Sequence, residues 1–173
     1  MGTDKALMEV DGRALALRVA NELGKACQSV ALVGDPLRYQ GLGIPVVADN
    51  FPGEGPLSGI EAALGATGAD WNLIVACDMP DVGAETVEPL FTVDGDCNVP
   101  MMPDGRTQPL CAVYHRRLHA AIRAMIEAGV RRVIDVPGNL EKLGFAVRYV
   151  RMDSDAPFAN LNTPEDLRRY LGG

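Results

Sequence analysis

The sequence predicts an α/β fold with a mainly parallel sheet flanked by helices. Short continuous apolar runs, typical of buried strands, alternate along the chain with apolar stripes at helical spacing. The chain has 173 residues, 47% of them apolar and 23% charged, which matches one globular domain over residues 1–173. No internal repeat or long linker divides it. These observations favour strand–helix units built around one sheet.

The first half of the chain begins with a helix. Leucine and valine residues at helical spacing predict this helix over 14–26. Apolar runs at 29–33 and 44–47 predict two short strands. The loop 51–59 holds three glycines and two prolines, which excludes regular structure, and it leads into a helix near 59–66.

The second half alternates in the same way and contains the most apolar strand candidate, at 72–77. The further predicted elements are a helix at 84–91, strands at 97–99 and 108–113, a helix at 115–128, a strand at 145–150 and a helix that opens at Thr163. Every predicted unit has its strand except the first, whose helix follows a loop. We therefore expect the first strand of the fold to be missing.

Charge and composition exclude several classes of protein. The net charge of −7 argues against a partner such as nucleic acid, although a local pocket can still bind a small phosphorylated substrate. No apolar run is long enough to span a membrane, and the first ten residues do not form a signal peptide. The four cysteines show no C-x-x-C pair. A reduced, cytoplasmic protein is expected.

Asp78 is the first candidate for chemistry, because it follows the predicted strand 72–77 directly. Ligands of open α/β sheets bind beyond the carboxyl ends of the strands, where a carboxylate can hold a divalent metal. The alternative is that Asp78 only caps a turn before Pro80. Cys77 is interpreted as a small buried hydrophobic residue, because no base lies near it in sequence to make it a nucleophile.

Two further segments have the composition of a phosphate site. Lys5 precedes a helical segment, where its point charge can add to amide donors, although a surface lysine has the same signature. The Gly55-Pro56-Leu57-Ser58-Gly59 stretch permits close approach of a ligand to the backbone, and it is equally compatible with an ordinary tight connection. It lacks the phosphate-loop pattern G-x-x-x-x-G-K-[ST].

Two pairs of side chains have weaker signals. His115 and His119 would share one helical face, but arginines stand between them where a zinc-binding helix has glutamate, which argues against a metal site. Asn160 and Asn162 would point the same way in an extended segment, as ligand contacts or as turn and cap residues.

The order of these segments is more specific than any one of them, and it closely resembles the bacterial molybdenum cofactor guanylyltransferases over essentially the whole chain. The segments that carry the resemblance are Met1-Gly2-x-Asp4-Lys5-Ala6-Leu7, Gly55-Pro56-Leu57-x-Gly59-Ile60, Cys77-Asp78-Met79-Pro80, Gln108-Pro109-Leu110 and Phe158-x-Asn160-x-Asn162-Thr163-Pro164-Glu165-Asp166-Leu167. The resemblance implies a Rossmann-like nucleotidyltransferase fold. It also implies transfer of GMP from GTP to the phosphate of molybdopterin, with release of pyrophosphate.

Roles follow from the resemblance residue by residue. Asp78 matches the Mg²⁺ ligand and Lys5 the phosphate-binding lysine, and we expect these two to be catalytic. Asp49 matches a nucleotide-binding aspartate, and Gly55, Pro56, Leu57 and Gly59 look like part of the nucleotide pocket. Gln108, Pro109, Asn160 and Asn162 resemble positions nearer the pterin. The resemblance further implies transient contacts with molybdenum insertion proteins and recipient molybdoenzymes, and no contact with nucleic acid or membrane.

The front of the chain departs from the family pattern. In the family, a strand and a Gly-rich loop of the type L-A-G-G-x-S-x-R precede the methionine that is Met1 here. We therefore expect a shortened form that is catalytically impaired, or a start codon placed too late. Three alternatives stay open: a cytidylyltransferase of the same cofactor, a more distant sugar-phosphate nucleotidyltransferase, and a non-catalytic module that binds a nucleotide or the pterin.

Overall fold

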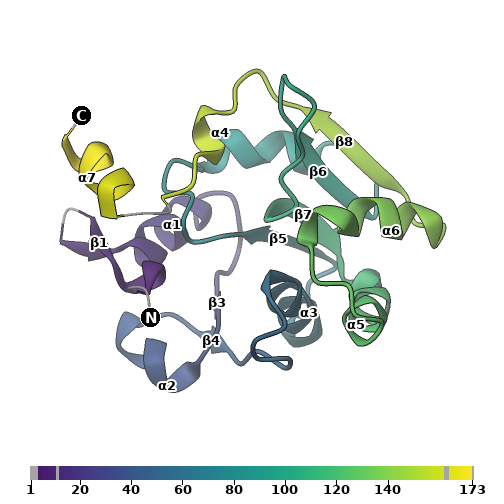
Figure 1. Cartoon of the computed structure of the whole chain (residues 1–173), viewed down its shortest axis with the longest axis horizontal. Helices are drawn as coiled ribbons and strands as arrows, with labels where there is room; N and C mark the ends of the chain where they lie inside the picture. Colours follow the sequence, from purple (N-terminus) through teal and green to yellow (C-terminus); the bar gives the residue numbers. More distant parts are fainter. Residues whose placement is uncertain (1–3, 11, 162–163, 173) are drawn as a thin grey trace.

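A four-stranded sheet lies at the centre of the computed structural model, which describes residues 4–10, 12–161 and 164–172 (Figure 1). Its strands, in spatial order, are β5 (Trp71–Val75), β7 (Cys111–His115), β6 (Cys97–Met101) and β8 (Val147–Arg151). β6 and β8 pair in parallel, whereas β7 runs antiparallel to both β5 and β6. Three strands therefore point the same way, in an α/β fold as predicted.

The reversed direction of β7 follows from its short connection to β6. Met102 donates a backbone hydrogen bond to the Arg106 carbonyl, 2.8 Å away, and Gly105 adopts a φ of 86° in the turn between them. Such a short connection can join only antiparallel neighbours, because a parallel crossover needs about a dozen residues or more. The expected mainly parallel sheet is therefore interrupted at β7.

Helices cover both faces of this sheet (Figure 1). Ala112 and Tyr114 of β7 pack with α3 (Pro56–Ala66), α5 (His119–Glu127) and α6 (Val136–Lys142). The alternate β7 residues, Cys111 and Val113, pack in a second cluster with α1 (Leu15–Leu23) and α4 (Ala84–Val87). The period of two along β7 thus divides the core into two layers.

The N-terminal segment contains a short turn and a hairpin before α1. These are the 3-10 turn η1 (Lys5–Leu7) and the strands β1 (Glu9–Val10) and β2 (Arg13–Ala14), which pair antiparallel. The predicted apolar stripe of α1 is confirmed, since Leu15, Val19 and Leu23 are buried. The helix ends before Gly24, three residues earlier than predicted. Within the described residues, no strand comes before η1.

The strands β3 (Leu32–Val33) and β4 (Val46–Val47) form a separate parallel pair. Both strands are half-buried, and both lie within the ranges predicted from sequence. β5, the most apolar strand candidate in the sequence, lies at an edge of the four-stranded sheet, and Asn72–Val75 are also half-buried. The strands with the most buried residues are instead β6 and β7, each of which has a partner on both sides.

Proline positions explain most differences between predicted and observed helices. The predicted helix 84–91 divides into α4 and the 3-10 turn η3 (Glu88–Phe91), which has a proline in its first turn. α6 was not predicted, and Pro137 lies in its first turn, where the amide of a residue has no partner within the helix and a proline is tolerated. The other elements are α2 (Pro36–Tyr39), η2 (Gln40–Leu42), η4 (Arg116–Leu118), η5 (Val133–Asp135), η6 (Ala156–Phe158) and α7 (Pro164–Gly172).

The predicted helix 115–128 begins too early. His115 ends β7, η4 follows it, and the α-helix starts at His119. The predicted end is confirmed, with Gly129 at a φ of 86° after the helix. Among the described residues, no helix is both long and apolar enough to cross a membrane.

Candidate active site

The structure brings Lys5 and Asp78 together. Asp78 follows β5 by three residues, and its Oδ2 lies 3.1 Å from the Nζ of Lys5. The two side chains are 34% and 18% exposed, respectively, so that both reach solvent. Seventy-three positions of sequence separate the two residues. The fold thus makes an ion pair, open to solvent, from two residues that the sequence motifs marked independently.

Asp4 fixes the turn that presents Lys5. One carboxylate oxygen accepts a hydrogen bond from the amide of Ala6 (3.1 Å) and caps η1. The other accepts from the hydroxyl of Tyr39 (2.9 Å) and pairs with Arg38. Burial and the Asp4 hydrogen bond raise the pKa of Tyr39 to about 12, so the phenol remains a donor at neutral pH. Sequence reasoning missed this support from α2.

A glycine makes room for the Tyr39 ring. A Cβ atom at Gly34 would lie 2.5 Å from a ring carbon of Tyr39, closer than van der Waals contact allows. The φ of Gly34 is 157°, which side chains rarely adopt. Gly34 directly follows β3. From the sequence it could be interpreted only as the end of that strand, and its contact with Tyr39 could not be predicted.

Two further candidate segments meet the end of β5. The amide of Ala76 donates to the carbonyl of Leu110 (2.8 Å), which places the Gln108-Pro109-Leu110 turn beside this end. The carbonyl of Asp78 accepts from the amide of Leu161 (2.8 Å), the residue after exposed Asn160. Asn162 lies outside the described residues.

Gln108 is half-buried, and its backbone amide donates to the Pro100 carbonyl (3.2 Å). Pro109 is buried and accepts a hydrogen bond from the buried hydroxyl of Tyr114 (2.8 Å). The turn is therefore fixed by the core of the sheet, and its conformation does not depend on a ligand.

Asp49 lies outside the Lys5–Asp78 pair, in the segment that connects β4 to α3. One of its oxygens accepts from the amide of Phe51 (2.8 Å), and the other lies 2.8 Å from the hydroxyl of Ser58. Gly55, at a φ of 86°, precedes α3, and Pro56 occupies the first helical position. We refer to residues 49–55 as the 49–55 loop.

Ser58 was not predicted as a site residue, although it lies inside the predicted motif. Its hydroxyl also lies 2.6 Å from the carbonyl of Gly55, so the single proton serves either Asp49 or Gly55. Leu57 belongs to the hydrophobic core, with its side chain fully buried, whereas Gly59 is half-buried. Leu57 therefore contributes packing, and its side chain does not face solvent.

The prediction that His115 and His119 share a helical face is wrong, because His115 ends β7 and α5 begins only at His119. The Nδ1 of His115 accepts from the amide of Arg117 (3.0 Å), and His119 contacts Glu61 instead. Over the part of the chain that the structure describes, no group of three or more His, Cys, Asp or Glu side chains could hold a metal ion.

The Cys77 thiol is next to Asp78 but is chemically unreactive. Burial raises the pKa of the Cys77 thiol to about 11, and the negative charges of Asp78 and Asp4 act in the same direction. Because the nucleophile is the thiolate, a thiol protonated at neutral pH is inert. This agrees with the interpretation of Cys77 as a small hydrophobic residue.

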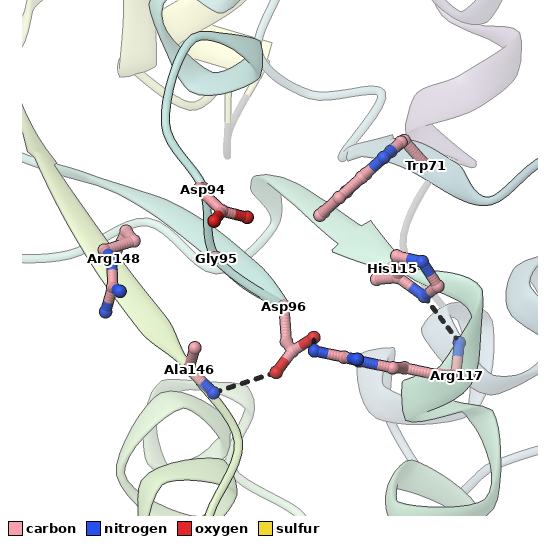
Figure 2. Close-up of a pocket in the computed structure, with 8 residues that line it drawn as sticks. All are labelled: Trp71, Asp94, Gly95, Asp96, His115, Arg117, Ala146 and Arg148. Carbon is pink, nitrogen blue, oxygen red and sulfur yellow. Dashed lines mark hydrogen bonds and ion pairs between the residues drawn. The ribbon is translucent and has the colours of Figure 1, made fainter.

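A hollow of about 280 Å³ lies at the opposite end of β5, where Trp71 begins the strand (Figure 2). Asp96 is buried in it, accepts from the amide of Ala146 (2.9 Å) and pairs with Arg117. The edge of the Trp71 ring meets His115, with ring centroids 4.7 Å apart. Neither Lys5 nor Asp78 lines this hollow.

Comparisons with known proteins agree on one family. The family model described as a MobA-like NTP transferase domain matches residues 1–143. A molybdenum cofactor guanylyltransferase from Cereibacter sphaeroides is 36% identical, over 97% of this chain and 86% of the relative. Another of the same name, from Vibrio atlanticus, is also 36% identical, over 98% of this chain and 87% of the relative.

Solved structures show the same fold. Molybdopterin-guanine dinucleotide biosynthesis protein A from Archaeoglobus fulgidus superposes with a TM-score of 0.79 at 25% identity, over 99% of this chain and 90% of that one. The 2-C-methyl-D-erythritol 4-phosphate cytidylyltransferase from Thermus thermophilus has a TM-score of 0.75 at 19% identity, over 97% and 92%, and this likeness extends to the fold alone. The chain is a nucleotidyltransferase and belongs to the family of MobA-like NTP transferases.

Proposed function

We propose that this protein transfers GMP from GTP to the phosphate of molybdopterin, which forms molybdopterin guanine dinucleotide and pyrophosphate. The observation that carries the proposal is the solvent-open pair of Lys5 and Asp78 beyond the end of β5. The names of relatives that share 36% of their residues with this chain support the same reaction.

The reaction is an attack of a phosphate oxygen on the α-phosphorus of GTP. It needs no covalent nucleophile, so the protein contributes mainly position and charge neutralisation. Lys5 supplies a point charge for the phosphates, and the Asp4 cap holds its backbone in place. Neutral, protonated Cys77 next to Asp78 is compatible with this chemistry.

Asp78 is the residue that would hold Mg²⁺. Mg²⁺ usually keeps several waters and binds to proteins through one or two carboxylates plus substrate phosphates. A partly exposed carboxylate with a lysine beside it fits this mode, because the phosphates and water complete the ligand set. When bound, the metal neutralises charge on the phosphates. Until then, Lys5 partly balances the Asp78 charge.

The remaining site residues divide between the two substrates. Asp49 with Gly55, Pro56 and Gly59 is proposed to bind the nucleotide, through backbone that glycine leaves accessible. Leu57 supports this pocket from the core. Gln108, Pro109, Asn160 and Asn162 are proposed to lie toward the pterin. The contacts of Leu110 and Leu161 with the end of β5 support this assignment.

The test is to incubate the protein with molybdopterin, Mg²⁺ and either GTP or CTP, and to measure the dinucleotide and pyrophosphate. We expect both products with GTP and little product with CTP. Equal or greater turnover of CTP would favour the cytidylyltransferase alternative. Nucleotide binding without pyrophosphate release would favour a non-catalytic module. A single domain, a cytoplasmic location and contacts with insertion proteins and recipient molybdoenzymes stay predictions.

A further inference from the structure

Glu61 of α3 is a buried carboxylate that the proposed reaction does not use. Its side chain is 0% exposed. Burial of a charge is costly unless the charge is paired and hydrogen-bonded. The contacts that satisfy Glu61 should therefore show what the residue does.

The two oxygens of Glu61 face different parts of the molecule. Oε2 accepts from the side-chain amide of Asn50 (2.9 Å), which belongs to the 49–55 loop. Oε1 lies 2.9 Å from Nε2 of His119 and 3.5 Å from the guanidinium of Arg123, both on α5. Glu61 thus connects the loop to α5 across α3.

A glycine in α3 lets the His119 side chain of α5 come close enough to contact Glu61. A Cβ atom on Gly65, one turn after Glu61, would lie 2.9 Å from Nε2 of His119. The imidazole therefore lies directly against the α3 backbone, with its Nε2 at the Glu61 carboxylate.

α5 and the turn after it hold the 49–55 loop at two more points. The Arg123 guanidinium lies over the ring of Phe51, 5.3 Å from its centroid. Arg131 pairs with Glu54. Asn50, Phe51 and Glu54 thus each contact a side chain outside the loop, while Asp49 is bonded within the loop and to Ser58.

We propose that Glu61 is a positioning residue that holds the 49–55 loop in the conformation that receives the nucleotide, an inference that rests on the proposed function. Gly53 and Gly55 of this loop both adopt a φ of 86°, so the backbone has much conformational freedom to lose. If contacts of the fold order the loop in advance, the nucleotide does not have to order it on binding. Loss of the contact should therefore raise the KM for GTP more than it lowers kcat.

The test exchanges the amide and the carboxylate of the Asn50–Glu61 hydrogen bond between the two positions. Asn50→Asp places a second carboxylate against the buried one, and we expect the KM for GTP to rise about tenfold or more, with kcat within about threefold of wild type. Adding Glu61→Gln should bring the KM back to within about threefold, because the new amide can donate to Asp at 50 while its oxygen still accepts from His119. Asn50→Ala, at an exposed position, should raise the KM about tenfold without introducing a buried charge.

The matched control is Asn21→Asp, which adds the same charge at an exposed position of α1 and should leave the KM unchanged. A KM for GTP that Asn50→Asp and Asn50→Ala leave unchanged would overturn the proposal. So would an Asn50→Asp defect that Glu61→Gln fails to relieve.

Hydrogen exchange separates this proposal from the proposed function, because it needs no substrate. Amides of residues 49–55 should exchange faster in Asn50→Asp and return to the wild-type rate in the double variant. If wild-type protein forms no dinucleotide, the proposed function fails and exchange alone decides the role of Glu61. Unchanged exchange in Asn50→Asp would then overturn that role.

Discussion

The end of β5 and the interface between α3 and α5 each contain a carboxylate, and the two differ in their surroundings. Asp78 remains partly exposed, and its partner Lys5 also reaches solvent. Glu61 is fully enclosed, with both oxygens contacted by neighbouring side chains. A carboxylate open to solvent can exchange its partner for a ligand, whereas an enclosed one acts through the contacts it already has. The first arrangement suits a reaction centre and the second a support.

The largest effect is expected at the open carboxylate. Asp78→Asn keeps the size of the side chain but removes the charge proposed to hold Mg²⁺. We expect the rate of guanylyl transfer to fall by a factor on the order of 10²–10³, with an unchanged melting temperature. Asp81→Asn, at an exposed position three residues after Asp78, is the matched control. Near-normal turnover by Asp78→Asn would remove this residue from the metal site.

The second prediction concerns Lys5, the partner in the open pair. Lys5→Ala should weaken binding of GTP and GDP by about tenfold to a hundredfold, because a charged hydrogen bond to the phosphates is lost. Binding of guanosine, which has no phosphate, should change little. Calorimetric titrations of all three ligands measure this, with Lys25→Ala as a surface control. Equal losses for guanosine and GTP would place Lys5 elsewhere.

A smaller effect is expected at Ser58, which contacts the 49–55 loop from the first turn of α3. Ser58→Ala removes the hydroxyl next to Asp49 and Gly55, and should raise the KM for GTP about fivefold, the usual effect of one neutral hydrogen bond. Ser154→Ala, at an exposed position, serves as the control. If kcat falls and the KM stays constant, Ser58 acts on the reaction itself, which the account does not predict.

The smallest effect is expected for the thiol beside the open carboxylate. Since the pKa of Cys77 is raised to about 11, roughly one thiol in ten thousand is ionised at pH 7. Cys77→Ala should therefore change kcat by less than about twofold, and iodoacetamide should modify Cys77 slowly at pH 7. Rapid alkylation, or a large loss of activity in Cys77→Ala, would restore the nucleophile interpretation.

The open site could be predicted from sequence, because its chemistry lies in short motifs at the ends of elements. Asp78 directly follows an apolar run, and Lys5 stands in a segment with a distinct pattern. The family inferred from these motifs is confirmed by the comparisons, and relatives that match the chain are named molybdenum cofactor guanylyltransferases. That Lys5 and Asp78 form a pair depends on the tertiary fold and could not be seen in either motif.

The enclosed site could not be predicted. Glu61 and His119 are 58 positions apart, and no motif in the sequence joins them. Burial of the Glu61 carboxylate follows only from the packing of α3 against α5. The order of the strands could not be predicted either, because it also depends on tertiary packing. The apolar composition of β5 did not indicate that it lies at an edge of the described sheet.

A double-variant measurement tests most directly the central claim that Lys5 and Asp78 form one reaction centre. The values of kcat/KM for GTP are determined for wild type, Lys5→Ala, Asp78→Asn and the double variant in the same assay. Residues that act as a unit have non-additive effects. The account predicts that the double variant loses no more than about threefold beyond Asp78→Asn alone. Multiplication of the two single losses would show that the residues act independently, and would contradict the claim.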